Sequence, residues 1–238
     1  MVGGRRAVCA AGEAAWHAAA YAGLGVRWSV DRSVAWSRSS PHPYLFAAVT
    51  LRPDASIPSG VEGRVRDSWG ALVGEELPGW RPCPAGPWMF RDSSRCPVEP
   101  PAGVVITATQ DPLLFERIAF LAAGGRPPQR AGELHPPGSQ HYPGLHLYLA
   151  WRGERAIGTA LALIHETGIA VSALAVLAPE RRQGIGAALT ATALQAAPGL
   201  PATLSTSQIA APTYRRLGFI EVGTPVDWVP PNPERATP

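Results

Sequence analysis

The second half of the chain alternates between apolar strands and helices in a regular order. Residues 104–108 alternate as a strand. Asp111-Pro112 then predicts a helix start, because an acidic cap and a proline suit the first turn. The later pattern predicts strands at residues 145–151, 156–164 and 169–177, a helix at 184–197, a strand at 202–206, a helix at 210–217 and a last strand at 219–228. The order β-α-β-β-β-α-β-α-β predicts an α/β fold on a mixed sheet.

The first hundred residues are less regular and predict a smaller α/β unit. The elements expected there are a helix at residues 10–22, strands at 26–36 and 44–52, a helix at 61–76 and an extended piece at 80–90. A proline-rich connector follows at residues 96–101, and prolines favour extended linkers. The sequence therefore predicts an N-terminal domain over residues 1–101, a second domain over 102–229 and a disordered tail over 230–238.

Composition narrows the class of protein. The chain of 238 residues is 46% hydrophobic and 16% charged, which is typical of a globular protein. All 21 basic residues are arginine and are scattered, which argues against a nucleic-acid groove. Cys9, Cys83 and Cys96 have no metal-type spacing, so we expect no metal and a reducing cytoplasm. No apolar run reaches the ~20 residues of a membrane span, so we expect no membrane partner.

One segment carries most of the chemical information. Residues 174–189 read Leu-Ala-Val-Leu-Ala-Pro-Glu-Arg-Arg-Gln-Gly-Ile-Gly-Ala-Ala-Leu, a buried strand that runs through a turn into a helix. Free N–H groups and the positive dipole end at a helix start bind anions. Glycines at positions 184 and 186 let a pyrophosphate approach the backbone, and arginines at 181 and 182 supply charge-assisted hydrogen bonds. The segment therefore predicts a nucleotide-phosphate site.

The same segment resembles the acyl-CoA loop of the GNAT superfamily of N-acetyltransferases. Arg181-Arg182-Gln183-Gly184-Ile185-Gly186 matches Arg-x-x-Gly-x-Gly after a strand. A dinucleotide-binding loop would need a third glycine near Leu189 and a later acidic residue, and a phosphate-binding loop of an NTPase would need a lysine. One detail departs from the family pattern, because Pro179 lies two residues before Arg181 instead of three. Arg182 is therefore expected to share the role of Arg181.

A second motif supports the resemblance. Residues 207–219, Ser-Gln-Ile-Ala-Ala-Pro-Thr-Tyr-Arg-Arg-Leu-Gly-Phe, resemble the other GNAT signature, in which a short helix with a tyrosine leads into Leu-Gly-Phe. Both motifs stand in the family's order, with one strand between them, and the resemblance covers about half of the chain. It implies the GNAT acyl-CoA N-acyltransferase fold, with acetyl-CoA as co-substrate.

The resemblance also implies roles for individual residues. Tyr214 corresponds to the general acid that protonates the leaving sulfur, with a core tyrosine as the alternative. Ser207 corresponds to a residue that faces the pantetheine, with a helix cap as the equal alternative. The acetyl-CoA site is expected to comprise Leu174, Ala175, Val176, Arg181, Arg182, Gln183, Gly184, Ile185, Gly186 and Ala187, with N–H groups near 175 and 176 donating to the thioester oxygen.

No general base stands out in the sequence. His141, His146, His165 and Glu166 all qualify by residue type, and each is also a typical surface or loop residue. We expect direct attack by a primary amine of a small molecule or peptide, without an acyl-enzyme. The alternative is a non-catalytic acyl-CoA-binding or sensor module. The sequence leaves a homodimer open.

The N-terminal region faintly repeats the end of the chain. Leu77-Pro78-Gly79-Trp80 and the later Trp88 echo Leu217-Gly218-Phe219 and the later Trp228, with Glu75 in the place of Tyr214. We interpret this region as a degenerate GNAT-like half of a tandem protein. It contains no Arg-x-x-Gly-x-Gly loop, so the whole chain is expected to bind one CoA.

Overall fold

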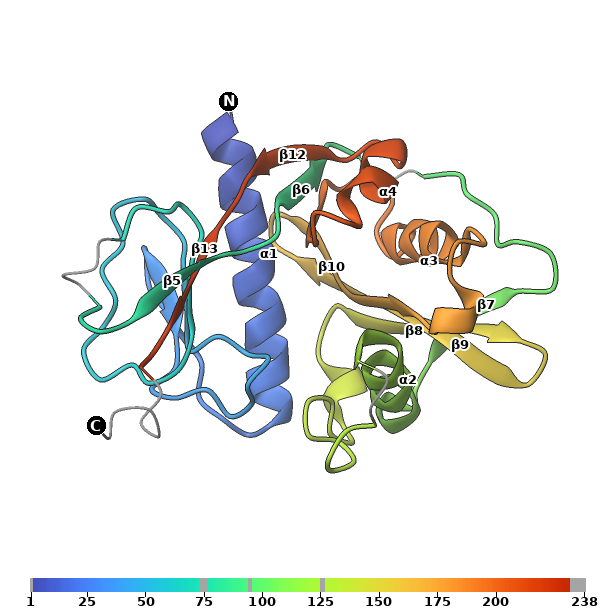
Figure 1. Cartoon of the computed structure of the whole chain (residues 1–238), viewed down its shortest axis with the longest axis horizontal. Coiled ribbons are helices and arrows are strands. Elements are labelled where there is room, and N and C mark those ends of the chain that lie inside the picture. The colour runs from blue at the N-terminus through green and yellow to red at the C-terminus, as the bar shows by residue number, and fades with distance from the viewer. Residues whose placement is uncertain (1, 73–76, 94–95, 125–126, 232–238) are drawn as a thin grey trace.

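The computed structural model describes residues 2–72, 77–93, 96–124 and 127–231. Two mixed sheets stand on either side of a long helix, α1 (Val2–Gly23), as Figure 1 shows. The fold is thus α/β, with α1 packed between the two sheets.

The C-terminal sheet contains most strands of the second half. Its order is β12 (Ile220–Gly223), β6 (Trp88–Arg91), β11 (Ala202–Ser205), β10 (Gly168–Val176), β9 (Arg155–His165), β8 (Leu145–Arg152) and β7 (Val105–Thr109). The strand pair β10 and β11 is parallel, and the other neighbours are antiparallel.

The N-terminal sheet is built from shorter strands. Its order is β1 (Ser29–Val30), β2 (Val34–Trp36), β3 (Ala48–Thr50), β4 (Val65–Asp67), β13 (Val226–Val229) and β5 (Arg81–Pro84). Here β3 and β4 are the parallel pair, and the other neighbours are antiparallel.

The two sheets exchange one strand each. Strand β6 follows β5 in the chain but inserts between β11 and β12, and β13 follows β12 but inserts between β4 and β5. Aligning β1-β2-β3-β4-β13-β5 with β8-β9-β10-β11-β6-β12 gives the same parallel or antiparallel relation at every neighbouring pair. The first half therefore repeats the strand plan of the second, as expected for a tandem GNAT-like chain. The division at residue 101 stays a prediction, because each sheet takes a strand from the other side of it.

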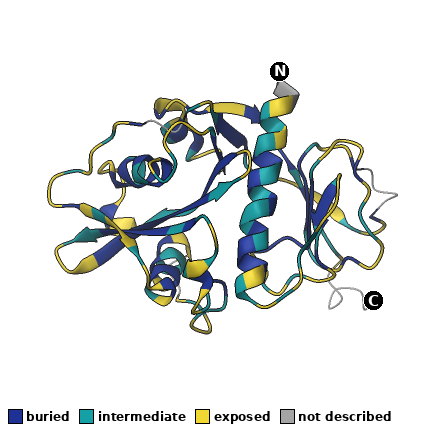
Figure 2. Ribbon diagram, turned by 180° about the vertical axis from the view of Figure 1, so that it is seen from behind, coloured by how far each residue is buried: buried dark blue, intermediate teal, exposed yellow. Residues whose placement is uncertain are grey.

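Helices cover both faces of the C-terminal sheet. Leu161 and Leu163 of β9 pack toward α1 and α2 (Pro112–Gly124), whereas Ala160 and Ala162 pack toward α3 (Ile185–Leu194). The short helix α4 (Ala211–Arg216) lies on the α3 side. Short 3₁₀ turns are η1 (Ser139–His141) and η2 (Ala178–Glu180). Figure 2 shows the strands buried beneath these helices.

Most sequence-predicted elements are confirmed. In the second half, the predicted β-α-β-β-β-α-β-α-β order is present from β7 to β12. Helix α2 has the expected cap, because Asp111 Oδ1 accepts a hydrogen bond from the N–H of Leu114 at 2.9 Å. The first predicted helix is α1, which is longer than expected and runs from Val2 to Gly23.

Three predicted elements are wrong. The single strand predicted at residues 26–36 is a hairpin, in which β1 and β2 pair antiparallel. Within residues 61–72 the chain forms β4 and turns instead of a helix, because Arg66 pairs with Asp227 of β13. The predicted last strand is two strands, since Pro225 lacks an N–H and the chain crosses there from one sheet to the other. Most of the predicted tail, residues 232–238, lies outside the described residues.

The long loop between α2 and β8 is anchored by a buried carboxylate. Glu116 accepts hydrogen bonds from the N–H groups of Gly132, Leu134 and His135 at 2.6–2.8 Å. The loop packs against the end of α1, where Gly23 approaches Ser139 and Pro136. This loop therefore forms part of the contact between the two halves.

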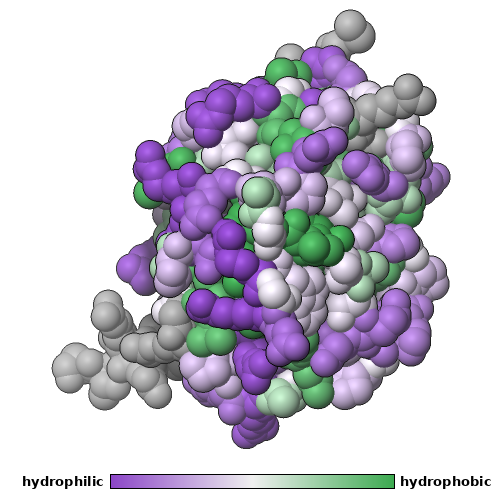
Figure 3. Space-filling model, turned by 90° about the vertical axis from the view of Figure 1, so that its right-hand side faces the viewer, coloured by the Kyte–Doolittle hydropathy of each residue, from purple (hydrophilic) through white to green (hydrophobic). Residues whose placement is uncertain are grey.

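The surface carries both hydrophilic and hydrophobic side chains. Hydrophilic side chains surround smaller hydrophobic patches on the face shown in Figure 3. Among the described helices, none combines the length and apolar character that crossing a bilayer requires.

Candidate active site

The parallel strands at the centre of the C-terminal sheet separate soon after they meet. Strands β10 and β11 pair only at Ile169 with Ala202 and at Ala170 with Thr203. From Val171 to Val176 the edge of β10 that faces β11 has no strand partner among the described residues. The gap leaves backbone hydrogen-bonding groups open to a ligand.

A bulge distorts β10 beside this gap. The register with β9 shifts between Ser172 and Ala175, and Ala173 has a positive φ of 47°. Thr159 stabilises the bulge by donating a hydrogen bond from its hydroxyl to the carbonyl of Ala173 at 2.7 Å. Bulges are found next to active sites because they redirect neighbouring groups, and this one lies where the strands part.

The predicted phosphate loop lies at the end of β10. Gly184 precedes α3 with φ 84°, and α3 has no side-chain cap. The first N–H groups of a helix lack intrahelical partners, so those of α3 are available to an anion. A Cβ built on Gly184 meets no atom within 4 Å, and its direction is therefore open space.

The loop and α4 enclose a cavity of about 770 Å³, which we call the α3–α4 cavity. Eight of the ten predicted acetyl-CoA residues line it, together with the predicted acid: Leu174, Val176, Arg181, Arg182, Gly184, Ile185, Gly186, Ala187 and Tyr214. This volume is in the range of small-molecule and cofactor sites. The sequence motifs thus come together on one face of the sheet.

The two loop arginines differ in their contacts. Arg181 donates to the carbonyl of Val176 at 3.0 Å and to that of Ala122 in α2 at 2.6 Å. Arg182 is exposed, has a positive φ of 63°, and makes no hydrogen bond or ion pair to another described residue. Arg182 is therefore the arginine left available to a phosphate, in line with the shifted proline, while Arg181 ties the loop to α2.

A polar brace holds the loop from below. Arg152 donates to Glu180 Oε2 at 3.1 Å and to Gln183 Oε1 at 2.7 Å. Glu180 is buried. Gln183 was predicted to bind the cofactor, but it points to Arg152 and does not line the cavity.

Tyr214 lies on α4 at the cavity wall. Its side chain is buried, and its ring meets Phe219 edge to face with centroids 6.0 Å apart. Burial raises the pKa of Tyr214 above its ordinary value, although a hydrogen bond with Thr206 opposes this shift. The phenol therefore stays protonated at neutral pH, which a proton donor requires.

The other predicted site residues lie outside the cavity. Ser207 Oγ accepts a hydrogen bond from the N–H of Ala210 at 3.3 Å in the turn before α4, but Ser207 is not the cap of that helix and does not line the cavity. Ala175 pairs with Thr159 on β9 and does not line the cavity. Glu75, which aligned with Tyr214, lies outside the described residues.

Seven further lining residues belong to the two sequence motifs but were not predicted as site residues. They are Glu180, Ile209, Ala210, Pro212, Thr213, Arg216 and Leu217. Ile209 is 93% exposed at the cavity wall. Arg216 could have been found as a cation two residues after the predicted acid.

A second cavity lies on the other face of the same sheet, against α1. This α1 cavity has a volume of about 250 Å³, and Ser172 of β10 and Ser205 of β11 form its floor. Glu13 and Trp16 of α1 and Arg66 of β4 line it from the opposite side. Because both cavities border β10, the gap between β10 and β11 lies between them.

None of the histidines or the glutamate considered as a base lines either cavity. Glu166 is exposed in the β9–β10 turn, His141 is exposed, and His146 stacks with Tyr148. Burial lowers the pKa of His165. Among the described residues, no group of three His, Cys, Asp or Glu side chains could hold a metal ion.

A family model matches the segment that builds this site. Residues 138–227 match the model described as the acetyltransferase (GNAT) domain. This stretch of the chain is therefore similar to a GNAT acetyltransferase domain. It contains the bulged strand, the loop, Tyr214 and the wall of the α3–α4 cavity.

Solved structures extend the GNAT fold to the rest of the chain. A GCN5-related N-acetyltransferase from Kribbella flavida is 20% identical, with a TM-score of 0.63 over 94% of this chain and 97% of that one. A conserved protein of unknown function from Staphylococcus epidermidis is 13% identical, with a TM-score of 0.60 over 87% and 94%. The likeness therefore includes the N-terminal sheet. No curated protein matches the chain.

Proposed function

We propose that the protein transfers an acetyl group from acetyl-CoA to a primary amine. The observation that carries the proposal is the α3–α4 cavity, where an uncapped helix start, Arg182 and Tyr214 surround the open edge of β10. The helix start and Arg182 would hold the pyrophosphate. The pantetheine would run along the open edge of β10 toward the gap.

The proposed reaction is direct attack without an acyl-enzyme. The amine nitrogen attacks the thioester carbonyl carbon, and the C–S bond breaks as the amide forms. Open backbone groups of β10 would stabilise the negative charge that develops on the carbonyl oxygen. Tyr214 would give its proton to the departing sulfur. The free cysteines do not line the α3–α4 cavity, which supports a mechanism without an enzyme thioester.

A thiol-release assay tests the proposal. The full chain is incubated with acetyl-CoA and a panel of small amines, peptides and amino sugars, and free CoA is measured with and without each acceptor. We expect acceptor-dependent release for at least one amine. Binding of acetyl-CoA by calorimetry without release over the whole panel would favour the non-catalytic acyl-CoA sensor. Absence of binding would refute both readings.

A further inference from the structure

We propose that Glu13 receives the acceptor, binding the ammonium group of a small primary amine in the α1 cavity and taking its proton. The inference rests on the proposed acetyltransferase function. It assigns the first half of the chain a direct part in the reaction, through a residue far from both sequence motifs.

The α1 cavity is in the right place for an acceptor. Its walls come from both halves: α1 and β4 on one side, and β6, β10 and β11 of the C-terminal sheet on the other. Ser172 and Ser205 belong to the two strands that separate beside the α3–α4 cavity. An amine held on the α1 side would therefore face a thioester that reaches the gap from the α3 side.

Close packing fixes Glu13 near this gap. The preceding residue, Gly12, lies so near the sheet that a Cβ there would come within 2.7 Å of Thr203 Oγ1 and 3.2 Å of the Ala170 Cβ. Ala170 and Thr203 are the last pair that joins β10 to β11. Helix α1 thus touches the sheet where the strands part, and Glu13 follows at the next position.

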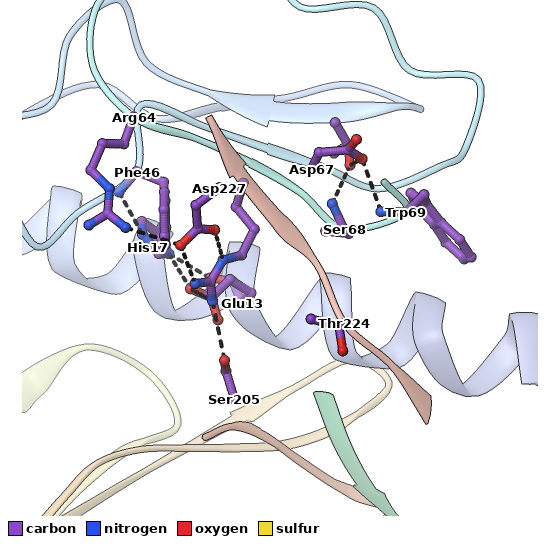
Figure 4. A network of polar contacts seen from close by, with 12 residues as sticks. Glu13, His17, Phe46, Arg64, Asp67, Ser68, Trp69, Ser205, Thr224 and Asp227 are labelled. Atoms are coloured by element: carbon purple, nitrogen blue, oxygen red, sulfur yellow. Dashed lines mark hydrogen bonds and ion pairs between the residues drawn. The ribbon is translucent and has the colours of Figure 1, made fainter. Parts of the chain in front are cut away.

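The cavity also contains a charge network that involves both halves (Figure 4). Asp227 of β13 accepts three hydrogen bonds through its two carboxylate oxygens: from Arg66 Nε at 2.8 Å, from Arg66 Nη2 at 3.0 Å and from Arg64 Nη2 at 3.0 Å. Arg66 also donates to Ser205 Oγ at 3.5 Å. Asp227 therefore already pairs with two arginines, through both of its oxygens.

Glu13 differs from Asp227, because its contacts to charged groups of described residues involve only one carboxylate oxygen, Oε1. Its carboxylate Oε1 forms an ion pair with Arg66 Nη1 at 3.3 Å and lies 3.7 Å from His17 Nδ1. His17 is neutral: burial lowers its pKa to about 4, and its Nε2 accepts a hydrogen bond from the N–H of Phe46. The side chain of Glu13 is 14% exposed and lines the cavity. An ammonium group is the ligand that a partly satisfied carboxylate in a confined cavity favours.

The size and walls of the α1 cavity restrict the acceptor. A volume of about 250 Å³ lies below the ~300–1,000 Å³ of drug-sized sites. Aromatic rings of Trp16, Tyr44 and Phe46 line it beside the charged groups. These features fit a small primary amine with an apolar body better than a peptide chain or an amino sugar.

The protons balance in the proposed sequence. Glu13 takes one proton from the ammonium, and the free amine attacks the thioester carbon. The C–N bond forms, the C–S bond breaks, and the sulfur takes the proton of Tyr214. The second proton on nitrogen restores the Tyr214 phenol by way of water, and Glu13 releases its proton to solvent. The net products are the amide, CoA thiol and one proton.

Glu13→Gln tests the assignment, because it removes the charge and keeps the shape. At saturating acetyl-CoA, we expect kcat/KM for amines that are protonated at the assay pH to fall about 10²-fold or more. An acceptor of low basicity, which is neutral at that pH, should lose much less. Acetyl-CoA affinity by calorimetry should be unchanged. Glu62→Gln removes an exposed carboxylate from the same half and is the matched control.

The outcomes separate this inference from the proposed function. If wild type acetylates small amines and Glu13→Gln has the same kcat/KM as Glu62→Gln, the assignment of Glu13 is overturned and the acetyltransferase stands. If peptides are much better acceptors than small amines, the substrate class is wrong. If wild type neither binds nor turns over acetyl-CoA, the proposed function fails first. Should Glu13→Gln not fold, Glu13→Asp keeps the charge, and we expect a folded protein with a raised KM for the amine.

Discussion

The two halves of the molecule have the same strand plan and differ at one decisive place. In the C-terminal sheet, the parallel strands β10 and β11 are joined by the arginine-glycine loop and α3. In the N-terminal sheet, the parallel strands β3 and β4 are joined by residues 51–64, which form turns without a helix. Without a helix start there are no converging N–H groups to bind pyrophosphate.

This difference separates the scaffold from the site. The strand order alone gives two similar sheets, but the anion-binding element is present in one of them. The first half instead provides α1, Arg66 and one wall of the α1 cavity. In the proposed reaction, this half forms a wall of the acceptor site although it has no arginine-glycine loop, and the predictions below test this difference between the halves.

The largest expected effect is a loss of stability at the point where the two sheets exchange strands. A Cβ on Gly86 would overlap the carbonyl oxygen of Thr206, where the chain passes from β5 into the other sheet. Gly86→Ala should therefore lower the free energy of unfolding by more than about 3 kcal/mol. Chemical denaturation measures this. Gly4→Ala, an exposed glycine of α1 with no atom near its Cβ, is the control. Equal midpoints for the two variants would contradict the described crossing.

The next effect concerns Tyr214, for which the first half has no described counterpart. Tyr214→Phe keeps the ring packed on Phe219 and removes the proton donor. Turnover should fall about 10²-fold or more, while acetyl-CoA affinity stays nearly the same. Steady-state kinetics with calorimetry measure the two quantities, and Tyr142→Phe serves as the control. Unchanged turnover would remove Tyr214 from the mechanism.

Two buried histidines, one in each half, predict an acid-sensitive fold. Burial lowers the pKa of His17 on α1 and of His135 in the α2–β8 loop to about 4. Because the folded state disfavours their protonation, stability should be full above the ordinary value near 6.5 and decline as pH falls toward 4. Each histidine contributes on the order of 3 kcal/mol at most.

Melting temperature against pH checks this expectation. His17→Gln should halve the fall in melting temperature between pH 6.5 and 4, because only one buried histidine then remains to take up a proton on unfolding. His141→Gln, which changes an exposed histidine, should leave the slope as in wild type. A wild-type melting temperature that is constant over this range would contradict the burial of both rings.

The smallest effect tests which half binds CoA. A Cβ on Gly186 meets Leu174 and Val176 at ordinary distances of 3.8 and 3.9 Å, so Gly186→Ala should fold. The added methyl narrows the α3–α4 cavity, and acetyl-CoA affinity should fall about tenfold. Calorimetry of wild type should give one molecule per chain. Two molecules per chain, or unchanged affinity in Gly186→Ala, would mean that the cofactor site is elsewhere.

Much of the second half could be predicted from the sequence, because its signals are local. The cap at Asp111, the paired glycines before α3 and the tyrosine of α4 each specify backbone or chemistry within a few residues. Eight of the ten predicted cofactor residues line one cavity for this reason. The exceptions, Ala175 and Gln183, make contacts to other strands that the sequence does not indicate.

The sequence by itself determined the order of elements in the second half, the turn with paired glycines before α3 and the resemblance to GNAT acetyltransferases. Only the tertiary structure decided that β6 and β13 change sheets, that residues 65–67 are a strand, and that Glu13 stands beside Arg66 over the gap in the C-terminal sheet. The physical reason is the separation in sequence between the residues that interact. Caps, turns and helix periodicity depend on neighbours along the chain, whereas a strand finds its partner, and a buried charge its counterion, among residues that are distant in sequence.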